Sequence, residues 1–107
     1  MLVSITEHHA NIVPWFLAQK NAGIEIEFVN VTEDYQIDMD DFRKKYDEKV
    51  KVVSLTRVSN VSGGVFDLKK VSESLRPDTI FVVDASQAIP NFDINVADLE
   101  CDFLIFT

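Results

Sequence analysis

The chain has 107 residues, with 18 acidic and 10 basic side chains, 47% hydrophobic residues and a single cysteine. This length suits one domain, and the apolar content argues against a disordered chain, because disordered chains lack the residues that build a core. The formal net charge of -8 disfavours nucleic acid and anionic membranes as partners, since both are bound through clustered Lys and Arg.

The cysteine count and the apolar runs bear on the compartment. One cysteine cannot form an internal disulfide, so nothing in the sequence indicates secretion. The first residues show no basic stretch followed by a long apolar one, and no run of ~20 apolar residues occurs. We therefore predict a cytoplasmic chain that is neither exported nor membrane-spanning.

The first half of the chain alternates strand and helix patterns. Residues 2–5 form a β-rich run. A helix is predicted to begin near Asn11, with Pro14 in its first turn, where the missing N–H costs little, and to end at Gly23. From 24 to 31, apolar and polar side chains alternate, which predicts a strand with one wet face near an edge of the sheet.

The second half continues the alternation. Asp38 is predicted to cap a short surface helix, and Asp67 to cap the next one. Asp84 stands at the carboxyl end of an apolar run of the buried-strand type. Three further strands are predicted, over residues 51–56, 79–83 and 103–106. Strands that alternate with helices predict one α/β domain over residues 1–107, with a mainly parallel β-sheet flanked by helices.

Several polar side chains follow the predicted strands. Ligands of open parallel sheets bind outside the carboxyl ends of the strands, so these residues are candidates for a site. Each also has a plain structural alternative: a solvated turn histidine, an N-cap aspartate, or turn and surface residues. The candidates are His8, Asn60, Asp84, Gln87 and Thr107.

Other kinds of site find little support. His8 and His9 make a poor metal pair, because adjacent residues in extended backbone point opposite ways and no third ligand has suitable spacing. No metal site is predicted. The chain has three glycines, and no dinucleotide or P-loop motif occurs among them. Cys101 is interpreted as a small structural residue rather than a nucleophile.

Four short motifs follow one another along the chain: EHHANIVPW at 7–15, VSNVSG at 58–63, VDASQA at 83–88 and LECDF at 99–103. In this order they resemble consecutive motifs of the class V aminotransferase family, whose members use pyridoxal 5'-phosphate (PLP) on fold type I. The closest branch is the Suf-type cysteine desulfurases. The resemblance runs over essentially the whole chain and implies that residues 1–107 are a fragment of the PLP-binding large domain.

The resemblance implies roles for the candidate residues. His8 matches the histidine that stacks on the pyridine ring and helps proton transfer, which makes it both catalytic and cofactor-binding. Asp84 matches the carboxylate that pairs with the pyridinium nitrogen, and Gln87 matches a hydrogen bond to the phenolic oxygen of the ring. Asn60 matches an amide near that oxygen and the substrate carboxylate, while Thr107 matches a hydroxyl that binds the cofactor phosphate.

The resemblance also implies an activity and partners. Such an enzyme removes sulfur from L-cysteine, giving alanine and an enzyme persulfide that serves a sulfur acceptor protein in iron–sulfur cluster assembly, and the family is homo-oligomeric. The lysine that holds PLP as a Schiff base comes three residues after the position of Thr107. The 107 residues alone are therefore expected neither to hold PLP covalently nor to turn over cysteine.

Alternatives to a Suf-type desulfurase fragment remain. Arg57 stands where Suf-type members often have histidine, and Gly64 where threonine is usual, so another class V PLP enzyme is one alternative. A non-catalytic α/β module that associates with itself is a second. A receiver-like signalling domain is a third, and it would require clustered acids after the first strand, where His8 and His9 stand instead.

Overall fold

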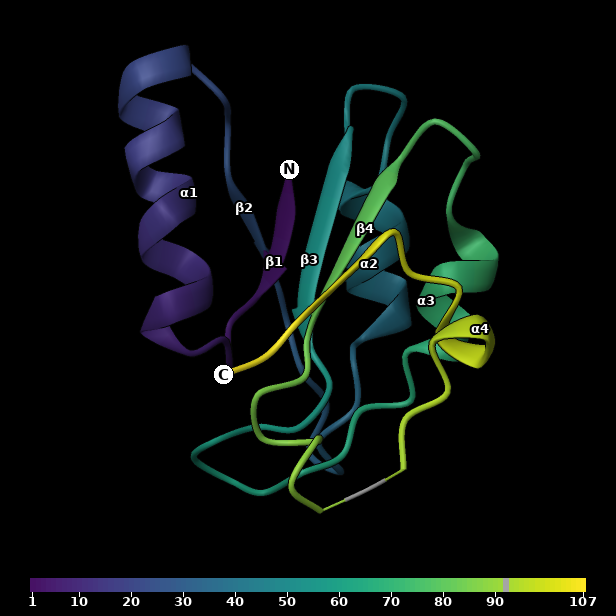
Figure 1. Ribbon diagram of the computed structural model, residues 1–107. Helices are drawn as coiled ribbons and strands as arrows, with labels where there is room; N and C mark the ends of the chain where they lie inside the picture. Colours follow the sequence, from purple (N-terminus) through teal and green to yellow (C-terminus); the bar gives the residue numbers. More distant parts are fainter. Residues whose placement is uncertain (92) are drawn as a thin grey trace.

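The computed structural model describes residues 1–91 and 93–107, in which strands and helices alternate (Figure 1). The elements are β1 Leu2–Ser4, α1 His9–Ala22, β2 Glu27–Val29, α2 Met39–Lys45, β3 Val52–Thr56, α3 Lys69–Ser74, β4 Ile80–Asp84, α4 Val96–Leu99 and β5 Phe103–Ile105. The strands form one five-stranded sheet in the order β2-β1-β3-β4-β5, and every neighbouring pair is parallel. The predicted α/β class is confirmed.

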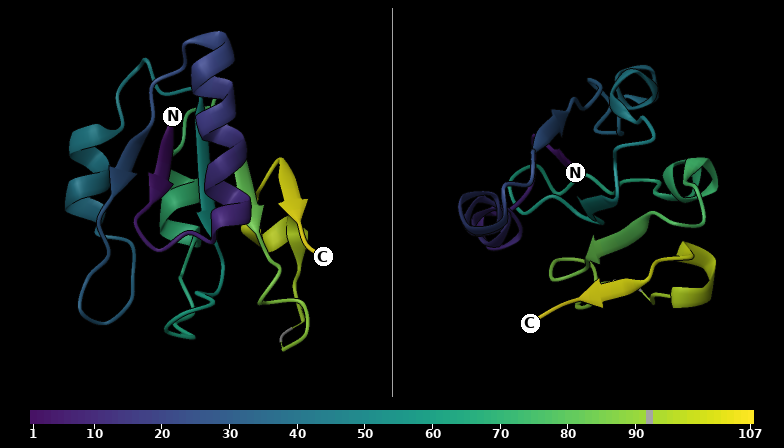
Figure 2. Two further views of the ribbon diagram at one scale, coloured as in Figure 1. Left: turned by 90° about the vertical axis from the view of Figure 1, so that its left-hand side faces the viewer. Right: turned by 90° about the horizontal axis from the view of Figure 1, so that it is seen from above.

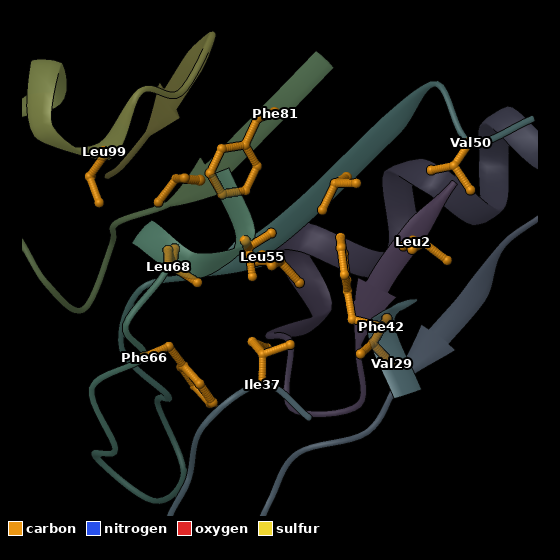
Figure 3. Packing of buried hydrophobic residues seen from close by; sticks show 13 residues of the cluster. Leu2, Val29, Ile37, Phe42, Val50, Leu55, Phe66, Leu68, Phe81 and Leu99 are labelled. Carbon is orange, nitrogen blue, oxygen red and sulfur yellow. The ribbon is translucent and has the colours of Figure 1, made fainter. Parts of the chain in front are cut away.

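Helices lie on both faces of this sheet. Helix α1 covers one face, and α2, α3 and α4 cover the other, as the view from above shows (Figure 2). The main core lies under α2, α3 and α4, where alternate strand residues meet the helices (Figure 3). Its buried members include Leu2, Val29, Phe42, Val53, Leu55, Val71, Phe81, Val83 and Leu99. Buried apolar surface of this kind is the main stabilising term of a small domain.

Helix α1 begins earlier than predicted. Its first residue is His9 rather than Asn11, because the His8 side chain caps the helix by accepting a hydrogen bond from the Ala10 N–H. Pro14 is consequently inside the helix and not in its first turn. Gly23 ends the helix as predicted, with a φ of 70° and its N–H donating to the Gln19 carbonyl.

Other boundaries shift for local reasons. The predicted strand over 24–31 shortens to β2 because the neighbouring strand β1 offers three paired residues. As expected, β2 is an edge strand of the sheet. Asp38 caps α2 as predicted, accepting from the N–H groups of Asp40 and Asp41. The prediction of Asp67 as the cap of α3 was wrong by one residue: the N-cap is Leu68, and the Asp67 side chain accepts from the Lys69 N–H.

Strand β5 forms the opposite edge of the sheet, and part of the α1 face there is uncovered. Leu104 packs against the core under the helices, which turns Phe103 and Ile105 to the α1 side, where they are 58% and 50% exposed. Ile80 of β4 is 43% exposed on the same face. In the two described ranges, no helix has both the length and the hydropathy to cross a membrane.

Candidate functional site

The predicted site residues all lie at the same edge of the sheet. Because the strands are parallel, the carboxyl ends of β1, β3, β4 and β5 lie together, at the lower edge in Figure 1. His8 follows β1, Asn60 lies in the turn after β3, Asp84 is the last residue of β4, Gln87 lies in the turn after β4, and Thr107 follows β5. We call this edge the carboxyl edge.

Asp84 is held at the centre of the carboxyl edge. It pairs with Thr56 in the β3–β4 register and is 8% exposed. One carboxylate oxygen, Oδ1, accepts from the Ser86 N–H at 3.0 Å, so Asp84 is both a half-enclosed carboxylate and the cap of the following turn. Within residues 1–91 and 93–107, no hydrogen-bond donor to the other carboxylate oxygen is found.

His8 presents an exposed imidazole at the same edge. Its Nδ1 accepts from the Ala10 N–H at 3.1 Å. In the neutral ring the proton is therefore on Nε2, which stays free to donate. His9 is the first residue of α1, and its ring centre is 6.1 Å from that of His8.

A closed turn carries Asn60 to the surface. Ser59, which is buried, accepts from the N–H groups of Val61 and Ser62 through Oγ, and its own N–H donates to the Gly64 carbonyl at 3.0 Å. Asn60 is exposed at this turn. The side chains of Gln87 and Thr107 are exposed as well. The ligand roles of all five site residues stay predictions.

The structure gives a physical reason for glycine at position 64, where the resemblance implies threonine. A Cβ at position 64 would lie 2.7 Å from the Cβ of Tyr35, which belongs to the neighbouring loop and has a φ of 59°. The loop that bears Asn60 therefore approaches the loop after β2 too closely for a threonine.

Gly64→Thr is expected to lower the free energy of unfolding by about 1–3 kcal/mol, because overpacking at this contact forces one loop to move. Tyr35→Gly removes the opposing side chain and suits the positive φ. The double variant should thus recover most of the loss in urea unfolding. Equal instability of the single and double variants would contradict this explanation.

A buried polar cluster beside these residues was not predicted from the sequence. The Glu7 carboxylate is 8% exposed and accepts from Ser4 Oγ at 2.6 Å, Asn11 Nδ2 at 2.6 Å and the Thr56 N–H at 2.9 Å. Ser54 Oγ donates to Asn11 Oδ1 at 2.8 Å. The available signals were the spacing of Glu7 and Asn11 at i and i+4, and the two hydroxyl residues in an apolar strand.

The environment of Glu7 opposes its ionisation. Burial raises the pKa of Glu7, the hydrogen bonds from Ser4, Asn11 and Thr56 act in the opposite direction, and the charge of Asp84 raises it further. Burial outweighs the other effects, so the pKa of Glu7 lies above its ordinary value of 4.5.

This shift predicts a pH dependence of stability. A carboxyl with a raised pKa in the folded state binds its proton more tightly there than in the unfolded chain. Its stabilising contribution is complete below pH 4.5 and is lost as the pH rises through the folded pKa. The free energy of unfolding of the wild type minus that of Glu7→Gln should therefore fall as the pH rises above 4.5, then level off.

Urea titrations at a series of pH values measure this difference. Asp41 and Asp78, whose pKa values are lowered mainly by hydrogen bonds from Lys45 and Lys51, act in the opposite direction but are common to both proteins and cancel. A difference that stays flat or rises with pH would show that burial does not dominate at Glu7.

The described residues also line a cavity that lies apart from the carboxyl edge. A cavity of about 590 Å³, lined by Trp15, Lys49 and Val52 among others, opens at the amino ends of the strands, whereas the predicted site lies at the carboxyl edge.

Cys101 packs against the core, and burial raises the pKa of its thiol. A protonated thiol is a poor nucleophile, which agrees with a structural role.

Comparison with known proteins matches the whole chain to one family. The family model described as Aminotransferase class-V matches residues 1–107. A probable cysteine desulfurase of Halalkalibacterium halodurans is 34% identical over 108 residues, covering 100% of this chain and 27% of the relative. A probable cysteine desulfurase of Xylella fastidiosa (strain Temecula1) is 38% identical over 108 residues, which cover 100% of this chain and 26% of the relative.

Solved structures give the same picture. The cysteine desulfurase CsdA of Escherichia coli has a TM-score of 0.88 at 28% identity, over 99% of this chain and 27% of that one. The apo cysteine desulfurase of Thermococcus onnurineus NA1 has a TM-score of 0.87 at 30% identity, again over 99% of this chain and 27% of that one. The chain thus spans about a quarter of the length of the proteins that it resembles.

Proposed function

Because the chain belongs to the aminotransferase class-V family, we propose that it forms part of the cofactor domain of a PLP-dependent cysteine desulfurase. Such an enzyme removes sulfur from L-cysteine, leaves alanine and passes the sulfur to an acceptor protein. The observation that carries the proposal is Asp84, a buried carboxylate at the end of a central parallel strand, with one oxygen fixed by the Ser86 N–H and no donor to the other among the described residues.

The residues of the carboxyl edge fit the ring of PLP. When bound, PLP supplies an electron sink for the substrate carbanion. The Asp84 oxygen that the Ser86 N–H does not bind would accept a hydrogen bond from the protonated pyridine nitrogen and keep the ring cationic, which strengthens that sink. His8 would lie against the ring, with its free Nε2 able to hold or release a proton. Asn60 and Gln87 would donate to oxygens of the ring and the substrate, and Thr107 to the phosphate.

The local charge favours a protonated pyridine nitrogen at Asp84. The negative charge of Asp84 is felt at Glu7, where it opposes ionisation of the second carboxyl. A cationic ring nitrogen beside Asp84 would offset this repulsion, because opposite charges in a partly desolvated site attract more strongly than in water. Asp84 would therefore act through electrostatics and hydrogen bonding.

The amine that attaches the cofactor would be supplied by another part of the enzyme. The seven lysines of this chain lie on helices or in the segment before β3, and none directly follows a strand at the carboxyl edge. They are Lys20, Lys44, Lys45, Lys49, Lys51, Lys69 and Lys70. We expect the complete enzyme to form a homodimer in a reducing cytoplasm.

A chimera tests the proposed function. These 107 residues would replace the matching segment of the Halalkalibacterium relative, which supplies the remaining residues, and the 107-residue chain alone serves as the comparison. With added PLP, the chimera should show the absorption of lysine-bound cofactor and release alanine from L-cysteine, while the chain alone should do neither. A folded chimera without either signal would contradict the proposal.

Self-association is a second candidate, favoured by the uncovered face of β4 and β5. Phe103, Ile105 and Phe106 are 58%, 50% and 55% exposed, and such a group of apolar side chains is typical of an interaction surface. In this second case the chain is a non-catalytic module that uses the fold without its chemistry.

Phe103→Ser combined with Ile105→Thr should weaken self-association of the chain by about tenfold or more, since burying one large apolar side chain contributes roughly 1.5–3 kcal/mol. Val61→Ser is the matched control, at a residue that is 88% exposed in the turn after β3. It should leave the strength of self-association unchanged. Light scattering over a concentration series measures the effect. A sharp monomer at high concentration would dismiss this candidate.

A further inference from the structure

We propose that Glu7 is a positioning residue for His8: its buried carboxylate fixes the turn between β1 and α1, and thereby the direction and the tautomer of the His8 imidazole. This inference rests on the proposed function, in which His8 lies against the cofactor. It concerns a residue whose side chain does not reach the ligand, and it is carried by the hydrogen bonds around Glu7 together with the cap at His8.

The Glu7 carboxylate joins three separate parts of the fold. Its Oε1 accepts from Ser4 Oγ, at the end of β1, and from the Thr56 N–H, at the end of β3. Its Oε2 accepts from Asn11 Nδ2, in the first turn of α1. One carboxyl therefore sets where the chain leaves β1, where the helix starts and how both sit against the next strand.

A second hydrogen bond completes the anchor. Asn11 Oδ1 accepts from Ser54 Oγ at 2.8 Å, so the first turn of α1 is tied to β3 both through Glu7 and directly. The side chains that form this cluster are all buried: Ser4 is 0% exposed, Glu7 8%, Asn11 7% and Ser54 0%. Buried hydrogen bonds of this kind tolerate little rearrangement, because any broken partner would be left without water.

His8 lies between these anchored residues but makes few contacts of its own. Glu7 precedes it and the first turn of α1 follows it, while its imidazole is exposed. In the described ranges its one side-chain hydrogen bond is the cap, in which Nδ1 accepts from the Ala10 N–H. The cap holds only while the backbone on both sides is fixed, so the orientation of the ring depends on the buried cluster next to it.

The chemistry of the pair at 7 and 11 supplies a swap test. In Glu7→Gln, the new amide could still accept from Ser4 and Thr56 through its oxygen, but in the observed orientation of the Asn11 amide its NH₂ would face Asn11 Nδ2, donor against donor. Adding Asn11→Asp restores the pair in reverse, with the new amide donating to the new carboxylate. The other carboxylate oxygen could still accept from Ser54 Oγ.

The experiment is ¹⁵N NMR of the imidazole nitrogens in the cofactor-free chain, which has two histidines, His8 and His9. At neutral pH the wild type should show His8 as a single tautomer with the proton on Nε2, while His9 shows the mixture of tautomers typical of a free ring. Glu7→Gln should shift the His8 nitrogens to the mixture, and Glu7→Gln with Asn11→Asp should return them to the single tautomer.

A purely structural role predicts a different result. It would lower the thermal midpoint of Glu7→Gln but leave the His8 nitrogens of the folded fraction unchanged, and this outcome would overturn the proposal. If Glu7→Gln does not fold, Ser54→Ala removes only the outer bond of the cluster. It should still move the His8 nitrogens part of the way to the mixture, and unchanged nitrogens there would equally overturn it.

The chimera separates this inference from the proposed function. There Glu7→Gln should lower kcat for alanine release by about 10- to 100-fold with little change in KM, as expected for a misplaced group next to the reacting atoms. The double exchange should restore kcat. If the chimera is inactive both with the wild-type segment and with Glu7→Gln, the proposed function is contradicted. The positioning role is decided separately, by the NMR result on the cofactor-free chain.

Discussion

Asp84→Asn in the chimera should lower alanine release by on the order of 100-fold or more, the loss that follows removal of one preorganised electrostatic group. A neutral amide cannot stabilise the positive charge of a protonated pyridine nitrogen, so the ring would withdraw electrons less strongly. The substitution keeps an oxygen for the Ser86 N–H, which preserves the turn after β4. The loss would therefore come from the charge and not from unfolding.

Activity and absorption, measured together, check this result. Asp40→Asn, on the exposed side of α2, is the matched control, since it removes the same charge away from the carboxyl edge. It should leave both signals unchanged. An Asp84→Asn chimera that retained full activity would show that this carboxylate does not pair with the ring.

Phe42→Ala should cost about 3–5 kcal/mol in the free energy of unfolding, as is usual for a fully buried aromatic side chain. Phe42 is 0% exposed, contacts the sheet from α2 and lies with its ring centre 5.2 Å from that of Tyr46. Domains of this size are stable by only about 5–15 kcal/mol, so much of the stability of the chain depends on this one residue.

Phe106→Ala is the matched control for that substitution. Phe106 is 55% exposed after β5, so the same change should alter the free energy of unfolding by no more than about 0.5 kcal/mol. Urea unfolding followed by circular dichroism gives both values. Similar losses of unfolding free energy in the two variants would mean that the packing of Phe42 from α2 does not stabilise the core.

The alternation of elements was predictable because each strand has a local signal. Period-2 runs and apolar stretches identified all five strands, and the capping residue Asp38 located the start of α2. The boundaries were less predictable where a tertiary partner sets them. Strand β2 is short because β1 is short, and α1 starts early because an imidazole serves as its cap, which no composition rule anticipates.

The site was predictable only as far as strand ends reveal it. In a parallel sheet the residue after each strand must lie at one edge, so Asp84 and His8 could be placed there without a structure. Apart from the i and i+4 spacing of Glu7 and Asn11, the Glu7 cluster could not, since its other members lie at 4, 54 and 56 and meet only when three elements pack. The contact of Gly64 with Tyr35 is of the same kind, because it joins two loops that no spacing relates.

A crystal structure of the chimera with PLP would show directly whether the carboxyl edge holds the cofactor. We expect an oxygen of Asp84 at about 2.7–3.2 Å from the pyridine nitrogen, a hydrogen-bonding distance, with the His8 ring against the pyridine. The cofactor should lie along the carboxyl edge. Cofactor in the 590 Å³ cavity at the amino ends of the strands, or Asp84 turned away from the ring, would contradict the assignment.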